Sequence, residues 1–433
     1  MINERSLFVR ARLSAMFVAV LLAGSRMAAG QSEFLVYSFP NPGSHGCLPQ
    51  GSLVADAAGN LYGTTACGGA FNFGVVYELA RPVPPKKQWI QRVLYSFTGG
   101  TDGQSPMSNL TIDPAGNLYG TTNTGGSGAG VGTVFQLTPP PVEGGAWAKS
   151  VLHSFQGGTA DGSTPGMAGV VFDGLGNLYG VTRMGGRNIP GFCNATGCGV
   201  IYRLTPPVTS GAAWTETVLH FFNGAQGTSG VGTPIFDGKG SLYGMAGNGS
   251  VYRLVPPAIE GGAWIYKELI NIGFTAGLSN GSLTFHNKGR LYGIASGGQH
   301  DLGAVFELVP PPPGGTWTEN TIYSFAGGRD GIAPNALGNV VFDKAGNLYG
   351  TTQYGGGNDC QPGRSGCGTV FELSPPATDG GAWTETILHS FYAVTTDGGE
   401  PSGGLILARN GVLYGVTSSG GGGTQGVVYG VVP

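Results

Sequence analysis

The chain has 433 residues, of which 83 are glycine and only 10% are charged, and its formal net charge is −3. Hydrophobic residues make up 40% of the chain, so apolar surface is available to offset chain entropy and disorder is disfavoured. No basic surface of the kind that binds phosphate is indicated, and we expect no nucleic-acid partner.

The first 30 residues have the order of a secretory signal peptide. Arg5, Arg10 and Arg12 precede the apolar run "LSAMFVAVLLAG", and small residues follow up to Gly30. The run is too short to span a bilayer comfortably. We predict a signal peptide at residues 1–30 and a mature domain at 31–433, which keeps 17 basic and 23 acidic residues. An uncleaved N-terminal anchor is the alternative. The expected localisation is secreted, periplasmic or at the cell surface, with no membrane span in the mature chain.

One unit of four short segments then repeats along the chain. The second copy reads "SNLTID", "NLYGTT", "GTVFQL" and "WAKSVLHSF", and each segment is β-branched or aromatic and bounded by turn residues, as strands are. The tyrosine-glycine pair of the second segment recurs at intervals of 49 to 65 residues. It occurs seven times, at Tyr62, Tyr119, Tyr179, Tyr243, Tyr292, Tyr349 and Tyr414.

Four strands per unit at this period predict a β-propeller, with an open solenoid as the competitor. The six tryptophans each open a fourth strand, and the seventh unit stops after its third strand. The mature chain begins with an unpaired fourth-strand sequence at Phe34–Phe39. A closed ring uses this strand and removes the exposed sheet edges. We therefore predict an all-β fold of seven four-stranded blades, in which Phe34–Phe39 is the outer strand of the last blade.

Three local features of the repeat are structural. Leu118 and Tyr119 point to opposite faces of a strand, so both faces must be covered, as stacked blades would cover them. The glycine after each repeated tyrosine predicts a close backbone approach or a bulge. The turns "IDPAGN" and "FDKAGN" place Asp and Asn where they bond the local backbone.

The combination of "GNLYGTT", "GTVF", "WTET" and "VLYSF" resembles the GloVer tandem-repeat family of secreted bacterial proteins, and the resemblance covers Phe34–Pro433. It implies export and a repeat fold. It implies no activity, because the family is defined by its repeats. Some members carry surface-anchoring tails, and this chain shows no recognisable anchor at its end. The strand order resembles NHL-type propellers more loosely.

Six cysteines in an exported chain favour disulfides, and the loops that carry them emerge on one face of an up-and-down blade. We predict the pairs Cys47–Cys67, Cys193–Cys198 and Cys360–Cys367. No paired CxxC spacing supports zinc, and we predict no metal site and no cofactor.

Histidines and aspartates supply few candidates for chemistry. His153, His220 and His389 stand where other units have tyrosine, and are expected to be framework residues. His45, His286 and His300 break the pattern and are expected to be solvated, although His300 adjoins Asp301 and such a pair could serve acid–base work. Four aspartates before glycine could bind calcium or sugar hydroxyls, or could be turn residues only. They are Asp102, Asp161, Asp330 and Asp397.

No nucleophile elbow, phosphate loop or HExxH motif occurs, and we predict no catalytic residue. The leading hypothesis is a monomeric, non-catalytic propeller that binds a glycan or protein through its longest loops. The alternatives are an extracellular carbohydrate-active lyase or hydrolase, and a structural surface protein. The predicted ligand-binding residues are Arg183, Arg187, Tyr354, Asp359, Arg364, His300 and Asp301.

Overall fold

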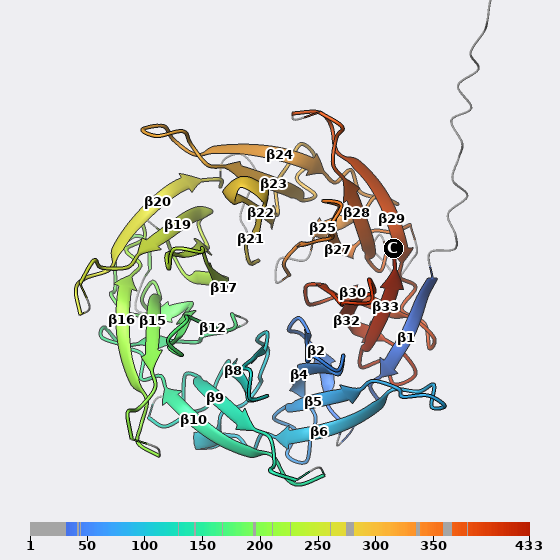
Figure 1. Cartoon of the computed structure of the whole chain (residues 1–433), viewed down its shortest axis with the longest axis horizontal. Helices are drawn as coiled ribbons and strands as arrows, with labels where there is room; N and C mark the ends of the chain where they lie inside the picture. Colours follow the sequence, from blue (N-terminus) through green and yellow to red (C-terminus); the bar gives the residue numbers. More distant parts are fainter. Residues whose placement is uncertain are drawn as a thin grey trace, which may run out of the picture.

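Seven antiparallel sheets form the blades of a ring in the computed structural model (Figure 1). The structure describes residues 32–40, 43, 45–128, 130–142, 144–166, 168–193, 196–209, 211–225, 227–259, 261–273, 281–334, 338–357, 366–378 and 380–433. The predicted signal peptide lies outside these residues. Within them, no helix has the length and apolar character needed to cross a membrane.

Blades 1 to 3 follow the predicted order of strands from the axis outward. Blade 1 contains β2 (Cys47–Pro49), β3 (Val54–Ala55), β4 (Leu61–Cys67), β5 (Val75–Ala80) and β6 (Ile90–Ser96). Blade 2 contains β7 (Thr111–Ile112), β8 (Leu118–Thr122), β9 (Thr133–Thr138) and β10 (Ala148–Ser154). Blade 3 contains β12 (Val171–Phe172), β13 (Leu178–Val181), β15 (Val200–Thr205) and β16 (Thr215–Phe221), beside a short ladder of β11 (Gly162–Ser163) and β14 (Met184–Gly185).

Blades 4 to 7 repeat this order. Blade 4 contains β17 (Gly230–Phe236), β18 (Leu242–Ala246), β19 (Ser250–Val255) and β20 (Ile265–Asn271). Blade 5 contains β21 (Thr284–His286), β22 (Arg290–Ala295), β23 (Ala304–Val309) and β24 (Thr318–Ser324). Blade 6 contains β25 (Ile332–Pro334), β26 (Val341–Phe342), β27 (Leu348–Tyr354), β28 (Thr369–Ser374) and β29 (Thr384–Ser390). Blade 7 contains β30 (Gly398–Pro401), β31 (Ile406–Leu407), β32 (Leu413–Gly420), β33 (Val427–Val432) and β1. Two 3₁₀ turns are η1 (Gly100–Asp102) and η2 (Asn287–Gly289).

The N-terminal strand closes the ring as predicted. β1 (Ser32–Ser38) pairs antiparallel with β33, the last strand of the chain, so the outer strand of blade 7 comes from the N-terminus. Its end continues into Phe39, whose buried ring packs edge-on against Tyr77 of blade 1. Closure by a terminal strand leaves neither end of the repeat array as an open edge.

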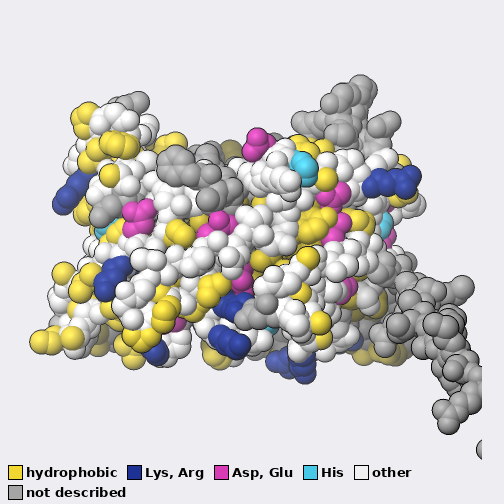
Figure 2. Space-filling view, turned by 90° about the horizontal axis from the view of Figure 1, so that it is seen from above, with side chains coloured by type: hydrophobic (Ala, Val, Ile, Leu, Met, Phe, Trp, Pro, Cys, Tyr) yellow, Lys and Arg dark blue, Asp and Glu magenta, His cyan; other side chains and the backbone are white. Residues whose placement is uncertain are grey.

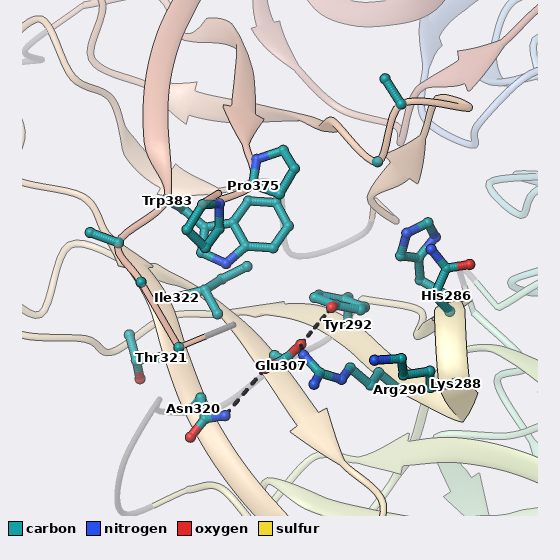
Figure 3. Close-up of a pocket in the computed structure, with 17 residues that line it drawn as sticks. His286, Lys288, Arg290, Tyr292, Glu307, Asn320, Thr321, Ile322, Pro375 and Trp383 are labelled. Atoms are coloured by element: carbon teal, nitrogen blue, oxygen red, sulfur yellow. Dashed lines mark hydrogen bonds and ion pairs between the residues drawn. The ribbon is translucent and has the colours of Figure 1, made fainter. Parts of the chain in front are cut away.

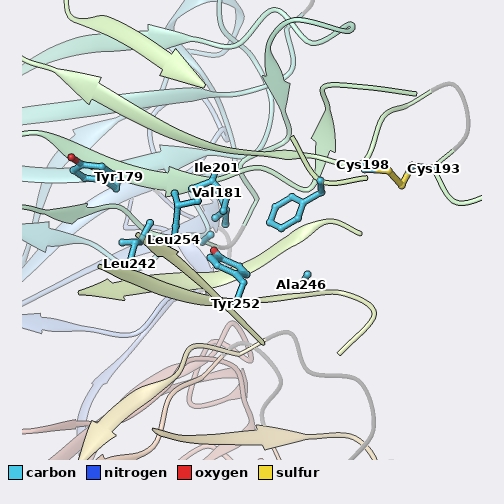
Figure 4. Packing of buried hydrophobic residues seen from close by; sticks show 11 residues of the cluster. Tyr179, Val181, Cys193, Cys198, Ile201, Leu242, Ala246, Tyr252 and Leu254 are labelled. Atoms are coloured by element: carbon cyan, nitrogen blue, oxygen red, sulfur yellow. A yellow bond between two sulfur atoms is a disulfide. The ribbon is translucent and has the colours of Figure 1, made fainter. Parts of the chain in front are cut away.

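The core lies between consecutive blades, because each sheet is apolar on both faces. Figure 4 shows one such layer, in which Tyr179 and Ile201 of blade 3 meet Leu242, Tyr252 and other residues of blade 4. At this and the equivalent boundaries, which we call seams, each tryptophan packs near the repeated tyrosine of the preceding blade, as Trp147 does at Tyr62. Burial at seven such seams holds the ring together.

The glycine after the repeated tyrosine makes the close approach predicted for it. A Cβ added to Gly63 would lie 2.4 Å from the hydroxyl of Tyr77, its cross-strand partner, and one added to Gly350 would lie 2.5 Å from the ring of Phe371. Glycine thus lets a large aromatic ring of the third strand cover the second strand. All seven copies share this pairing of glycine with an aromatic residue.

Two of the three predicted disulfides are present, Cys47–Cys67 and Cys193–Cys198. Cys47 and Cys67 are direct cross-strand partners of β2 and β4. The third prediction involves Cys360, which lies outside the described residues. Disulfides of this kind fit an oxidising compartment.

The topology gives the ring two distinct faces. Turns from first to second strand and linkers from third to fourth strand open on one face, which we call the turn face. Loops from second to third strand, including the disulfide loop of blade 3, open on the opposite face, which we call the loop face. Around the rim seen in Figure 2, uncharged side chains predominate, and cationic and anionic side chains are scattered.

Candidate functional site

A polar network recurs at the turns of the turn face. In blade 2, Asp113 accepts hydrogen bonds from the backbone and side-chain nitrogens of Asn117, at 2.9 and 2.7 Å, and from the hydroxyl of Tyr119, at 3.1 Å. The same three residue types make the same bonds in blades 1, 3 and 6. The repeated "D…GNLY" phrase therefore encodes a turn that is fixed by one carboxylate, as the sequence predicted.

Blade 5 replaces this network with other chemistry. His286 stands in place of the aspartate, and Arg290 stands in place of the asparagine. Arg290 pairs with Glu307 at 2.7 Å, and the Tyr292 hydroxyl donates to the same carboxylate at 2.5 Å. Asn320 donates to the other oxygen of Glu307 at 3.2 Å. Blade 5 has thus lost the turn carboxylate and keeps the one on the third strand, β23, which blade 1 also has at Glu78.

His286 stacks on a ring of the next blade. Its ring centroid lies 3.9 Å from that of Phe342, and the two planes differ by 8°. Burial lowers the pKa of His286, and the charge of Asp343 opposes this effect only in part, so the imidazole is neutral near pH 7. The sequence predicted a solvated loop residue here, and the structure shows a half-buried one.

A pocket of about 760 Å³ opens at this departure from the repeat, in the seam between blades 5 and 6 (Figure 3). Its walls come from η2, β22 and β24 of blade 5 and from the turn and linker of blade 6. Trp383 and Pro375 supply an apolar wall, and Figure 3 shows Glu307 and Arg290 opposite that wall. Lys288 is exposed beside them. The volume suits a small ligand.

A second, smaller pocket lies at the seam between blades 7 and 1, where the repeat is broken again. Its volume is about 330 Å³, and Asp56, Arg81 and Arg409 line it. Ala408 occupies the place of the turn aspartate in blade 7 and also lines the pocket. Both pockets therefore lie on the turn face beside a turn that has lost its aspartate.

The predicted ligand-binding residues that the structure describes lie in the loops of three blades rather than in one cluster. Arg183 and Arg187 flank β14 in blade 3, and the Arg187 guanidinium lies 5.0 Å from the ring centroid of Phe221. His300 and Asp301 lie between β22 and β23, and Tyr354 ends β27. Blade 4 separates the two arginines from the other residues. Asp359 and Arg364 lie outside the described residues.

The axis is surrounded by small uncharged residues where the first strands meet. Asn109 accepts a hydrogen bond from the Ser52 amide at 2.6 Å, and Thr233 accepts one from the Gly169 amide at 2.8 Å. The Thr233 amide donates to Ser282 at 2.8 Å. The side-chain nitrogen of Asn109 also donates to Thr233 at 3.4 Å, so these bonds join blades 1 to 5 and involve no titratable group.

The aspartates before glycine meet the repeated tyrosine or histidine of the outer strands at the rim. Asp102 accepts a bond from the Tyr95 hydroxyl at 2.9 Å, and Asp397 lies 3.2 Å from the Nε2 of His389. Backbone amides also bond these carboxylates, as Thr98 does to Asp102 at 2.8 Å. The turn role predicted for them is thus present, together with a side-chain partner that sequence reasoning did not assign.

Each of these pairs also faces a residue of the next blade, because the outer strands follow one another around the rim (Figure 1). At the seam between blades 1 and 2 this residue is Lys149, which donates to Asp102 at 2.6 Å. At three other seams it is a glutamate, which brings two carboxylates together. These glutamates are Glu216, Glu385 and Glu33.

The paired carboxylates have strongly perturbed protonation. Burial, followed by the charge of Asp161, raises the pKa of Glu216 to about 7. Burial and the adjacent Asp330 raise the pKa of Glu385 to about 8. Burial raises the pKa of Glu33 to about 7, although His389 opposes the shift. Sequence reasoning did not single out these glutamates, because their partners lie in a different repeat.

Comparison with solved structures supports the fold alone. Virginiamycin B lyase from Staphylococcus aureus aligns at 12% identity over 93% of this chain and 99% of that one, with a TM-score of 0.51. The PQQ-bound aldose sugar dehydrogenase from Streptomyces coelicolor aligns at 12% identity over 93% and 98% of the two chains, with a TM-score of 0.43. AofleA from Arthrobotrys oligospora aligns at 12% identity over 83% and 90%, also with a TM-score of 0.43.

No curated protein matches the sequence. The Gloeobacter/Verrucomicrobia repeat matches residues 25–249, 144–360 and 246–433, which together span nearly the whole chain. The matched residues include all seven blades described above. The chain therefore belongs to the Gloeobacter/Verrucomicrobia repeat family.

Proposed function

We propose that this protein is an exported, non-catalytic recognition module that binds a saccharide in the pocket between blades 5 and 6. The observation that carries the proposal is the coincidence of the larger described pocket with a turn whose repeat residues have been replaced. Framework residues would be expected to follow the repeat. Residues that depart from it beside a cavity are candidates for ligand contact.

The lining of the pocket supports a saccharide. Trp383 and Pro375 offer an apolar wall against which the C–H face of a sugar ring can pack. Asn320 and Thr321 are exposed on the wall and offer donors and acceptors for hydroxyl groups. Among the described residues of the lining, Lys288 and Arg290 outnumber the single carboxylate, Glu307, so an acidic sugar is favoured over a neutral one.

The bonds of Glu307 support recognition rather than hydrolysis. A glycoside hydrolase of the usual kind needs two carboxyl groups that flank the scissile bond, one of them able to give a proton. Glu307 has a side chain only 7% exposed and accepts bonds from Arg290, Tyr292 and Asn320. It is the one carboxylate among the described residues that line this pocket.

The test is binding of the purified chain to a panel of neutral and acidic glycans, followed by analysis of the same mixtures for cleavage products. The Lys288→Glu variant should weaken binding of an acidic glycan at least tenfold, because it reverses the charge at the pocket. Lys239→Glu is the matched control, since Lys239 has the same turn position in blade 4 and does not line this pocket.

Alanine replacement of Arg183, Arg187, Tyr354, Asp359 and Arg364 tests the loop face in the same assay. Loss of binding in this variant, with Lys288→Glu unaffected, would move the site to the loop face. Cleavage products would contradict a purely binding role and would favour the rival hypothesis, an extracellular lyase or hydrolase. Equal binding by Lys288→Glu and by the unchanged chain would contradict the proposed pocket.

A further inference from the structure

Two clusters at the rim contain the same donor set in different seams. His153 and Asp161 of blade 2 meet Glu216 of blade 3, and His389 and Asp397 of blade 6 meet Glu33 of β1. In each cluster one atom from each residue lies within 4.8 Å of the other two. One imidazole and two carboxylates therefore lie at equivalent positions of two different seams.

The first cluster is largely shielded from solvent and not satisfied by its own bonds. The side chains of His153, Asp161 and Glu216 are 18%, 13% and 16% exposed. His153 Nε2 lies 3.5 Å from Asp161 Oδ2 and 4.0 Å from Glu216 Oε2. The buried Nε2 of His153 and the buried Oε1 of Glu216 have no hydrogen-bond partner, and neither has the buried Oε1 of Glu33 in the second cluster. Buried polar atoms of this kind need a partner.

A third seam has a lysine where these two clusters have a glutamate. Between blades 1 and 2, Lys149 stands at the strand position that Glu216 holds in β16 and that Glu33 holds in β1. Its ammonium group, on a side chain 3% exposed, donates to Asp102 at 2.6 Å. The chain thus supplies a positive charge at this seam. At the two histidine seams the corresponding residue is a carboxylate, so no ammonium group at that position balances the aspartate.

We propose that the His153–Asp161–Glu216 and His389–Asp397–Glu33 clusters each bind one divalent transition-metal ion that links neighbouring blades. Imidazole together with carboxylates suits Zn²⁺ and its first-row neighbours better than Ca²⁺ or Mg²⁺, which prefer oxygen ligands alone. A Zn²⁺ ion about 2.1 Å from each ligand atom places those atoms roughly 3.4 Å apart at tetrahedral angles. The first cluster has two of its three separations at 3.5 and 4.0 Å, so small side-chain movements would complete it.

The two ions would have different structural consequences. Glu216 belongs to the blade that follows His153, so the first ion would join two internal blades. Glu33 belongs to β1, the N-terminal strand that completes blade 7. The second ion would therefore fasten the closing strand of the ring to blade 6.

The remaining seams provide internal controls. His220 occupies the same strand position in blade 3 but stacks on Tyr266, with ring centroids 4.0 Å apart. At the seam between blades 5 and 6, Tyr323 replaces the histidine, and its hydroxyl donates to Asp330 at 2.6 Å and to Glu385 at 3.1 Å. Tyrosine thus hydrogen-bonds both carboxyl groups at this seam and takes the place of the metal-ligating imidazole, so no ion is proposed there.

The experiment is calorimetric titration of the purified chain, free of any histidine tag, with ZnCl₂ at pH 7, with CaCl₂ in a parallel arm. Two Zn²⁺ ions should bind per chain with at least tenfold preference over Ca²⁺. His153→Ala and His389→Ala should each remove one binding event, and His220→Ala should remove none. Zn²⁺ should also raise Tm in the unchanged chain, and raise it less in His389→Ala, which keeps only the first site.

Glu216→Lys keeps the test decisive if an alanine variant folds poorly. It copies the Lys149 arrangement into the seam between blades 2 and 3, so the variant should fold. It should also abolish one Zn²⁺ site, and any remaining increase of Tm with Zn²⁺ should then come from the other cluster alone. Absence of Zn²⁺ binding by the unchanged chain would overturn the proposal. It would mean that protons, and not metal ions, neutralise the carboxylates of the clusters. Two binding events that persist in both Glu216→Lys and His153→Ala would overturn it as well.

Discussion

The seam between blades 1 and 2 and the seam between blades 5 and 6 share one backbone plan and have opposite electrostatics. In both, a tyrosine of the outer strand donates to the aspartate that follows it, Tyr95 to Asp102 and Tyr323 to Asp330. The residue that faces the pair from the next blade is lysine in the first seam and glutamate in the second. A single position of the repeat thus decides whether a seam holds an ion pair or a shared proton.

The same two seams also differ on the turn face. Blade 1 keeps the network of Asp56, Asn60 and Tyr62. Blade 5 has His286 and Arg290 in the equivalent turn, and the larger pocket opens beside it. The contrast shows that aromatic and glycine positions maintain the ring, whereas polar positions at the seams vary from blade to blade. Sites that bind a ligand or an ion are therefore expected at the seams between blades.

Breaking the ion pair of the first seam should have the largest effect. Lys149→Met removes the cation from Asp102 and leaves a carboxylate that only Tyr95 and the Thr98 amide still bond. Burial alone would raise the pKa of Asp102, and the bonds from Lys149 and Thr98 outweigh it and hold that pKa below its usual value. Loss of one partner of such a shielded pair costs about 3 kcal/mol, which calorimetric unfolding can measure.

The double variant Lys149→Met, Asp102→Asn provides the control for this prediction. It removes both charges, so most of the lost stability should return. Together with the single variant Asp102→Asn it completes a double-mutant cycle that gives the coupling between the two residues. A loss below about 1 kcal/mol in the single variant would place the pair among weak surface ion pairs and contradict the comparison.

Removing the turn carboxylate should come next in size. Asp56→Ala leaves the amide and the side-chain nitrogen of Asn60 without their acceptor, at a cost of about 2 kcal/mol, while the Tyr62 hydroxyl keeps Glu78 as an acceptor. His286→Ala in blade 5 removes the stack on Phe342 and an edge contact with Tyr292, and should cost about 1 kcal/mol. Tm values of the two variants, measured together, test this order. Equal losses would mean that the two turns are held by comparable interactions.

The architecture could be predicted from the sequence because its signals are local. The spacing of tyrosine-glycine pairs fixed seven units, and the unmatched strand at Phe34–Phe39 required closure. Cys47 and Cys67 were paired correctly because both lie at the same end of one hairpin. These inferences need only strand periodicity and up-and-down connectivity.

The seam clusters could not be predicted in the same way. His153, Asp161 and their counterparts were each noted, but as separate features of the repeat. Their meeting with Glu216 depends on how the twisted outer strands succeed one another around the rim, which no local pattern encodes. The pocket had a visible signal, because His286 breaks the turn motif. A solvated role was expected for it, since its contact with Phe342 comes from the next blade.

The smallest predicted effect concerns the pH dependence of the carboxylate seam. Burial and Asp330 raise the pKa of Glu385 to about 8, from 4.5 for an exposed glutamate. Between these pH values the folded chain binds a proton that the unfolded chain releases, so this group makes stability fall as pH rises from about 4.5 to about 8. Glu385→Gln is neutral throughout and removes that decline. It should raise Tm by about 2 °C at pH 9 and change it little at pH 4.

Glu319→Gln, at the same strand position in blade 5, is the matched control. A Tm difference that is the same at both pH values would mean that Glu385 and Asp330 do not share a proton and would contradict the electrostatic contrast between the two seams.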